Sequence, residues 1–342
     1  MRKAAGWKKA MASLVSASTL FSCTITGTMN FSTVTAADGA NYAEALAMSL
    51  YFFDANECGT EVDDNCLTWR GNCHTYDAEA SLDSAANLSS SEKAMIKEAN
   101  GGSNTVDVSG GYHDAGDHIK FNVTMGFAAS SLAMSYYMNP GAYEKANCEG
   151  HFREVLKKTC DYLMKTTYLD NSGNVYAVCA TVANSADHDV TWEPPENQTY
   201  DRPTYWLTAS YNNSVTTATM ASALAGTAYV FKDVDAEYSA KCMKYSKALY
   251  DFAKKYPDMQ DTTSGLYRLT DTYIDDLALA EVWFYINGEG SLPTYKPTAN
   301  GCYNGQYYDY HLYCWDKVWS GYATLMYLSL IHISEPTRRS YI

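Results

Sequence analysis

The chain has 342 residues, of which 46 % are hydrophobic and 14 % aromatic, so it can bury a sizeable core, and general disorder is excluded. Its 39 acidic residues outnumber the 25 basic ones, and the resulting formal charge of −14 argues against binding to nucleic acid or to an anionic membrane surface. The 30 tyrosines suit a wet groove that contacts sugars, or equally a core and a surface that are simply rich in tyrosine.

The N-terminus has the pattern of an export signal. Its cations are Arg2, Lys3, Lys8 and Lys9. No charged residue follows over 10–34, and the small residues of Val34-Thr35-Ala36 fit a cleavage site. Residues 1–36 are therefore predicted to be a signal peptide of a secreted protein, and not a membrane span, because the stretch is polar and contains Gly27. Leu20-Phe21-Ser22-Cys23 leaves one alternative open, in which Cys23 anchors a lipoprotein.

Nine of the ten cysteines follow the predicted signal: Cys58, Cys66, Cys73, Cys148, Cys160, Cys179, Cys242, Cys302 and Cys314. Export would allow some of them to be oxidised, and an odd number leaves at least one without a partner in this chain. Their spacings match no zinc motif, so most are expected to be small core residues. One or two disulfides, for example within the Cys58–Cys73 loop, stay open.

Helical periodicity dominates the rest of the chain. A first helix is predicted over 41–56, and a second begins at the capping pattern Ser89-Ser90-Ser91-Glu92 and ends at Gly101-Gly102. Further helices are predicted over 127–138, 152–165, 216–231, 236–255, 274–286 and 318–327. Long polar loops such as 170–211 and 287–310 join them, and no run of alternating strands is found. The pattern predicts one all-α domain built from helix hairpins.

The last fifteen residues, 328–342, do not continue the helical pattern. The stretch 328–338, Leu-Ser-Leu-Ile-His-Ile-Ser-Glu-Pro-Thr-Arg, resembles the translation of a transposase adapter used in the preparation of DNA libraries. The native catalytic domain is accordingly predicted to span 37–327, with native sequence ending near Tyr327. A natural tail ended by proline is the alternative. In the first case Glu335 lies in adapter sequence and has no catalytic role.

The segment 110–121, Gly-Gly-Tyr-His-Asp-Ala-Gly-Asp-His-Ile-Lys-Phe, is the richest in chemistry. Paired glycines permit tight bends, and Asp114 and Asp117 can be aimed at one water from which a carboxylate removes a proton. Their repulsion would make them titrate as a coupled pair. A structural Asx-turn would use the same residues. A metal site is the third interpretation, because His113, Asp114, Asp117 and His118 all have ligand chemistry.

This segment resembles the signature of glycoside hydrolase family nine, which reads Gly-Gly-aromatic-x-Asp-Ala-Gly-Asp-His-x-Lys-Phe. The resemblance begins at 41–46, runs through Trp69-Arg70-Gly71 and reaches Trp315-Asp316. It implies an (α/α)₆ barrel that hydrolyses β-1,4-glucans, chiefly cellulose, with inversion at the anomeric carbon. It further implies that Asp117 is the catalytic base and that Asp114 helps to hold the nucleophilic water.

The same resemblance implies further substrate-binding residues. His188 would bind a sugar hydroxyl, and Trp192 would stack on a sugar ring, unless it is a loop tryptophan packed on prolines. Asp275 matches an acidic position near the cleft, or is an exposed acid at a helix N-terminus. Trp315 matches a tryptophan that stacks on glucose, whereas Trp319, one helical turn on, is expected in the core.

Two departures from the family pattern concern calcium and the general acid. Where relatives have carboxylates for calcium, this chain has Ser214 and Ala218, so neither calcium nor another cofactor is expected. The family's general acid, a Glu near the C-terminal end, would lie beyond this chain, which would hold about the first two-thirds of the barrel.

The sequence thus predicts part of a secreted endo-β-1,4-glucanase whose partner is a β-glucan such as cellulose, with no nucleic acid and no membrane after signal cleavage. Two alternatives remain. One is a non-catalytic glucan-binding fragment, and the other is a metal-dependent hydrolase whose metal is held by the histidines and aspartates of 113–118. The parent protein is expected to be a glycoside hydrolase, but this chain, without the general acid, is itself expected to be inactive on cellulose.

Overall fold

The computed structural model describes residues 40–190, 193–267, 272–293, 302–303, 306–307 and 313–334. Its α-helices are α2 (Tyr42–Asn56), α3 (Ser90–Ala99), α4 (Asn122–Met138), α5 (Pro140–Lys145), α6 (Glu149–Lys165), α7 (Ser185–Val190), α8 (Ser214–Phe231), α9 (Ala236–Lys255), α10 (Ile274–Ile286) and α11 (Trp319–Ser334). Its 3₁₀ helices are η1 (Val62–Asp64), η2 (Thr75–Glu79) and η3 (Pro195–Asn197). Among the described helices, none is long and apolar enough to cross a membrane.

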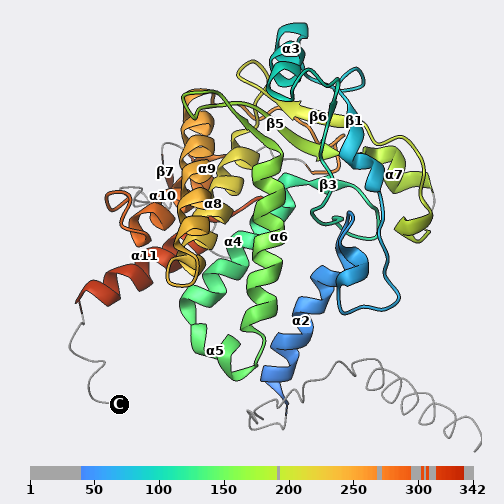
Figure 1. Ribbon diagram of the computed structural model, residues 1–342. Coiled ribbons are helices and arrows are strands. Elements are labelled where there is room, and N and C mark those ends of the chain that lie inside the picture. The colour runs from blue at the N-terminus through green and yellow to red at the C-terminus, as the bar shows by residue number, and fades with distance from the viewer. Residues whose placement is uncertain are drawn as a thin grey trace, which may run out of the picture.

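Helix α8 forms the centre of the helical part. All of its residues except Tyr229 are buried, and most are Ala, Thr or Ser. A helix that is apolar or small on every side is buried on every side. Accordingly α8 contacts α4, α6, α9 and α10. These helices lie close together in Figure 1, with α3, β1, β5 and β6 toward their upper end and α5 at their lower end.

The predicted helices are confirmed at most of their ends. Ser89 and Glu92 form the expected capping box at the start of α3, and Gly101 and Gly102 follow the helix with positive φ angles. Asn213 caps α8 by accepting a hydrogen bond from the backbone N–H of Thr216. These local signals need no tertiary contact, which is why the sequence locates them well.

The strands were not predicted. They are β1 (Ala80–Ser81), β2 (Thr105–Val106), β3 (Lys120–Phe121), β4 (Thr167–Leu169), β5 (Val175–Val182), β6 (Thr204–Leu207), β7 (Cys302–Tyr303) and β8 (Gln306–Tyr307). Strand β5 pairs antiparallel with β3, β4 and β6. It lies in the predicted loop 170–211, and every one of its residues except Tyr176 is buried. A strand buried on both faces lacks the polar alternation by which strands are recognised.

The C-terminal helix also differs from its prediction. Helix α11 begins at Trp319 and continues past Tyr327 to Ser334. Residues 328–334 are mostly apolar and contain no glycine or proline, so they extend the helix, and Pro336 follows two residues after its end. The origin of the residues after Tyr327 stays a prediction.

Gly226 provides a test of the packing at the centre. A Cβ atom at Gly226 in α8 would lie 2.8 Å from the Cβ of Ala133 in α4 and 3.1 Å from the ring of Trp283 in α10. Gly226→Ala is therefore expected to lower the free energy of unfolding by about 1–3 kcal/mol, measured by urea denaturation. The control is Gly150→Ala in α6, where the added Cβ meets nothing within 4 Å. That variant should gain up to about 1 kcal/mol, and an equal loss in both would contradict the prediction.

Candidate active site

Two backbone hydrogen bonds hold the stretch that leads into Asp114, at the start of the loop that carries Asp114 and Asp117. The N–H of Cys58 donates to the carbonyl of Gly111 at 2.9 Å, and the N–H of His113 donates to the carbonyl of Asn56 at 2.8 Å. Gly111 has a φ of 76°, and a Cβ there would lie 2.8 Å from the ring of Tyr162. The positive φ of Gly111 fits the tight bend that the sequence analysis expected of the paired glycines, and the missing Cβ leaves room for the Tyr162 ring.

Asp117 lies against His188. Asp117 is 7 % exposed, and its Oδ2 lies 2.8 Å from Nδ1 of His188, which is 71 residues away in sequence. Its Oδ1 accepts a hydrogen bond of 3.3 Å from the backbone N–H of Ile119. The pairing of β3 with the end of β5 brings Asp117 and His188 together. Strand β3 follows Asp117 in the chain, and β5 is followed by α7, which carries His188. The His188 side chain is 48 % exposed, so this edge of the pair faces solvent.

Asp114 is held by two hydroxyl groups. Its Oδ1 accepts a hydrogen bond of 2.6 Å from Thr124 in the first turn of α4, and its Oδ2 accepts one from Tyr267. Burial raises the pKa of Asp114, these hydrogen bonds oppose the rise, and the charge of Asp117 adds to it. The sequence analysis identified neither hydroxyl. Thr124 could have been found from its position at the start of a helix that follows the motif, but nothing in the loop sequence identifies Tyr267.

The predicted tryptophans have different positions. The ring of Trp315 packs edge-on against Tyr267, with 4.8 Å between ring centroids, so Trp315 reaches the site through the tyrosine that binds Asp114. Trp319 is 1 % exposed, as expected for the core. Trp192 lies outside the described residues.

Asp275 has a different environment from the one predicted. It is completely buried at the start of α10, and its Oδ2 accepts a hydrogen bond of 2.9 Å from the backbone N–H of Val318. Burial raises its pKa to about 6. The alternative of an exposed helix-terminal acid is therefore wrong, and the carboxylate of Asp275 connects α10 to the start of α11 instead of lining an open surface.

The segment compared with a calcium site contains no carboxylate ligand at the two substituted positions. Ser214 is buried and donates a hydrogen bond of 3.1 Å to the carbonyl of Ala253, and Ala218 is buried in α8. Ser214 thus connects the start of α8 to α9.

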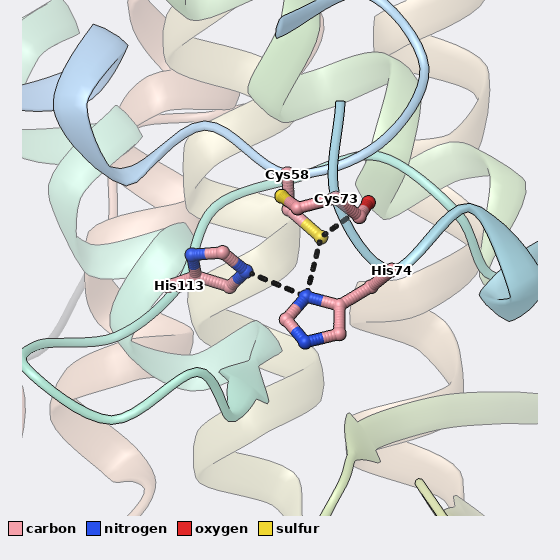
Figure 2. Close-up of side chains that lie close together, drawn as sticks. All are labelled: Cys58, Cys73, His74 and His113. Carbon is pink, nitrogen blue, oxygen red and sulfur yellow. Dashed lines mark hydrogen bonds between the residues drawn. The ribbon is translucent and has the colours of Figure 1, made fainter. Parts of the chain in front are cut away.

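A buried cluster of possible metal ligands lies next to the acidic loop. Cys58, Cys73, His74 and His113 each offer one ligand atom, and these atoms lie within 4.8 Å of one another (Figure 2). The Sγ of Cys58 lies 3.7 Å and the Nε2 of His113 lies 3.1 Å from the Nδ1 of His74. Tetrahedral Zn²⁺, with bonds of about 2.3 Å to sulfur and about 2.0 Å to nitrogen, separates its ligand atoms by about 3.3–3.8 Å.

The surroundings of His74 fit a metal ligand. Its Nε2 lies 2.8 Å from Oε1 of Gln198, an acceptor, so Nε2 carries the proton and Nδ1 keeps a lone pair. That lone pair faces the Nε2 of His113, and a cation between the two nitrogens would satisfy both. His74 also has a φ of 47°, a left-handed conformation that a histidine rarely adopts and that occurs at functional sites. Hydrogen bonding with Cys58 lowers the pKa of Cys73 to about 7.

This cluster bears on two possibilities that the sequence left open. Cys58 and Cys73 are free thiols and not a disulfide: the Sγ of Cys58 lies 3.7 Å from Nδ1 of His74, and the Sγ of Cys73 accepts a hydrogen bond of 3.5 Å from Arg70. The proposed metal set of His113, Asp114, Asp117 and His118 is not assembled, because Nε2 of His113 faces Nδ1 of His74 while the two aspartates bind Tyr267 and His188. The sequence analysis missed the cluster because its ligands come from three separate segments and are not part of a short cysteine motif.

A mainly helical domain that presents two carboxylates beside aromatic rings has the parts of a glycoside hydrolase site. The chain matches the model of Glycosyl hydrolase family 9 over residues 42–340 and belongs to that family. Endoglucanase A of Bacillus pumilus is 29 % identical over 250 residues, which are 72 % of this chain and 34 % of that protein. Endoglucanase B of Cellulomonas fimi is 32 % identical over 254 residues, which are 73 % of this chain and 22 % of that protein.

Solved structures agree with this family. The catalytic domain of CelT from Clostridium thermocellum matches with a TM-score of 0.75 and 35 % identity, over 87 % of this chain and 61 % of that one. The cellulase Cel9M of C. cellulolyticum in complex with cellobiose matches with a TM-score of 0.69 and 27 % identity, over 86 % and 63 %. These neighbours are (α/α)₆ barrels, and the helices of this chain form part of such a barrel, as predicted. The chain spans about a third or less of the two curated relatives named above.

Proposed function

We propose that this chain carries the base-bearing part of an endo-β-1,4-glucanase that hydrolyses cellulose or related β-glucans with inversion. The observation that carries the proposal is the buried Asp117 carboxylate bound to His188, with Asp114 beside it in the same loop. The relatives named above are endoglucanases, and one neighbour was solved with cellobiose, so a β-glucan is the substrate that the similarity favours.

Inversion requires a carboxylate base that activates water on one face of the sugar and an acid that protonates the leaving oxygen on the other. Each oxygen of Asp117 accepts one hydrogen bond, which leaves it a lone pair for a water molecule. Asp114, fixed by Thr124 and Tyr267, would hold that water from the side. Trp315 would stack on a glucose ring, and His188 would bind a sugar hydroxyl through its exposed edge.

The metal that the Cys-His cluster would hold has a structural role in this scheme. Four protein ligands leave a Zn²⁺ ion no open position for water, unlike the three ligands of a catalytic zinc. Cys58 and His113 would instead fix the loop that carries Asp114, because the cluster and the backbone hydrogen bonds at Gly111 and Asn56 hold the same stretch.

The test uses 2,4-dinitrophenyl β-cellobioside, because its phenolate leaves without a proton and the reaction therefore needs the base but no general acid. Inversion predicts that NMR detects α-cellobiose as the first product. A first product with the β configuration would overturn inversion. If the chain binds cellotetraose but hydrolyses no aryl cellobioside, it is the glucan-binding fragment of the alternative interpretation.

Residues 1–36 are proposed to direct secretion, on the strength of the four cations and the uncharged stretch that follows them. Mass spectrometry of the protein recovered from the medium of an expressing bacterium should find a mature N-terminus near Ala37 or Asp38. A mature protein that begins at a lipid-modified Cys23 would show that the lipoprotein alternative is correct.

A further inference from the structure

Two neighbouring residues of α7 hold two neighbouring residues of the acidic loop. Nδ1 of His188 lies 2.8 Å from Oδ2 of Asp117. Beside it, Oδ1 of Asp187 accepts a hydrogen bond of 3.1 Å from the backbone N–H of His118. These two contacts fix both the separation and the relative rotation of the loop and α7, which a single hydrogen bond would not do.

Asp187 is itself the end of a buried chain of alternating charges. Its Oδ2 lies 3.0 Å from Nη1 of Arg202, and Nε of Arg202 lies 3.0 Å from Oδ1 of Asp77. Oδ2 of Asp77 lies 2.7 Å from Nζ of Lys120. The four side chains are 0–3 % exposed. Neighbouring charges lower the pKa of Asp77 and raise that of Arg202, so both stay ionised.

Lys120, at the other end of this row of charges, contacts the segment that leads into the same loop. Nζ of Lys120 donates hydrogen bonds to the carbonyls of Val108 and Gly110, at 2.5 Å and 3.2 Å. The network therefore holds the loop before Gly111 and again at His118, on both sides of the two aspartates. Burial makes it rigid, because a buried charge without its partner is strongly disfavoured.

We propose that Asp187 is a positioning residue for the reaction: held by Arg202, it sets the geometry between Asp117 and His188. The inference rests on the proposed role of Asp117 as the base. Its chemical basis is that a displacement of about 1 Å at a reacting group lowers the rate by about 10²-fold, even when the substrate still binds.

The test variant is Asp187→Asn in the full 342-residue chain. The Asn carbonyl can still accept from His118, but the amide N–H₂ faces the guanidinium of Arg202, so the link between them is lost. We expect kcat for 2,4-dinitrophenyl β-cellobioside to fall about 10²-fold with KM changed less than about threefold. Asp54→Asn is the matched control, because Asp54 is also buried and accepts from a histidine, His151, at 2.9 Å. Its kcat should not change.

Folding and function are separated by two further variants. Asp187→Asn combined with Arg202→Gln removes one charge of each sign, so the buried chain stays neutral and can fold if the single variant cannot. A normal kcat in a folded variant without the Asp187 carboxylate would overturn the inference, even if the melting temperature falls. Asp117→Asn distinguishes this failure from that of the proposed function: if Asp117→Asn retains activity, the base assignment is wrong, whatever Asp187→Asn does.

Discussion

Replacing Asp117 by Asn is expected to lower kcat for 2,4-dinitrophenyl β-cellobioside by about 10²–10⁴-fold, the usual contribution of a positioned base. The amide has nearly the shape of the carboxylate and can keep the contact with His188, so the loop should not move. The amide, unlike the carboxylate, cannot remove a proton from water. Binding of cellotetraose, measured by calorimetry, should remain within about threefold of the original because the sugar contacts are retained.

The control for this variant is again Asp54→Asn, a buried carboxylate on α2 that contacts His151 and not the acidic loop. It should leave both kcat and binding unchanged. Full activity in Asp117→Asn would remove this carboxylate from the mechanism. Loss of both activity and cellotetraose binding would instead show that Asp117 supports the fold of the site more than its chemistry.

Removing a metal from the Cys-His cluster is expected to have the largest effect on stability. Structural Zn²⁺ contributes about 10–16 kcal/mol of binding free energy in small zinc-dependent domains. Even a fraction of that would lower the melting temperature by more than about 10 °C when the purified chain is treated with a strong chelator. Elemental analysis should first find about one zinc per chain, and re-addition of zinc should restore the melting temperature.

The matched variants are Cys73→Ala in the cluster and Cys242→Ala in α9, where the cysteine is equally buried but is not part of the ligand set. Both lose a small buried side chain and both should melt earlier. Only Cys73→Ala should become insensitive to chelator. Two outcomes would show that the cluster holds no structural metal. In the first, the chelator lowers the melting temperature of both variants equally. In the second, it changes the melting temperature of neither variant and not that of the unchanged chain.

The helices and the acidic loop could be predicted because their information is local. Helix α9 was predicted with both of its ends, since its apolar residues recur with helical spacing, and the structure adds that Asp235 caps its first turn. The pair Asp114 and Asp117 lies within one short segment, so its chemistry can be seen without any knowledge of the fold. The family resemblance then supplied His188, which is 71 residues away from Asp117.

The rest could not be predicted because it depends on distant contacts. Strand β5 is apolar on both faces and looks like a loop or a core segment in sequence. Tyr267 binds Asp114 from 153 residues away, and only folding brings the two together. Asp275 has the sequence of an exposed helix start, yet it is buried and accepts a hydrogen bond from the backbone of Val318, just before α11. Each of these errors arose where tertiary packing overrides a local pattern.

The nearly complete burial of α8 determines where this chain can accept variation. Its alanines, threonines and serines leave no free space between α4, α9 and α10, so almost any larger side chain would need the surrounding helices to move. Helix α9, by contrast, buries only one of its faces. Mutagenesis libraries for a more stable enzyme should therefore leave α8 unchanged and place their diversity at the exposed positions of α9.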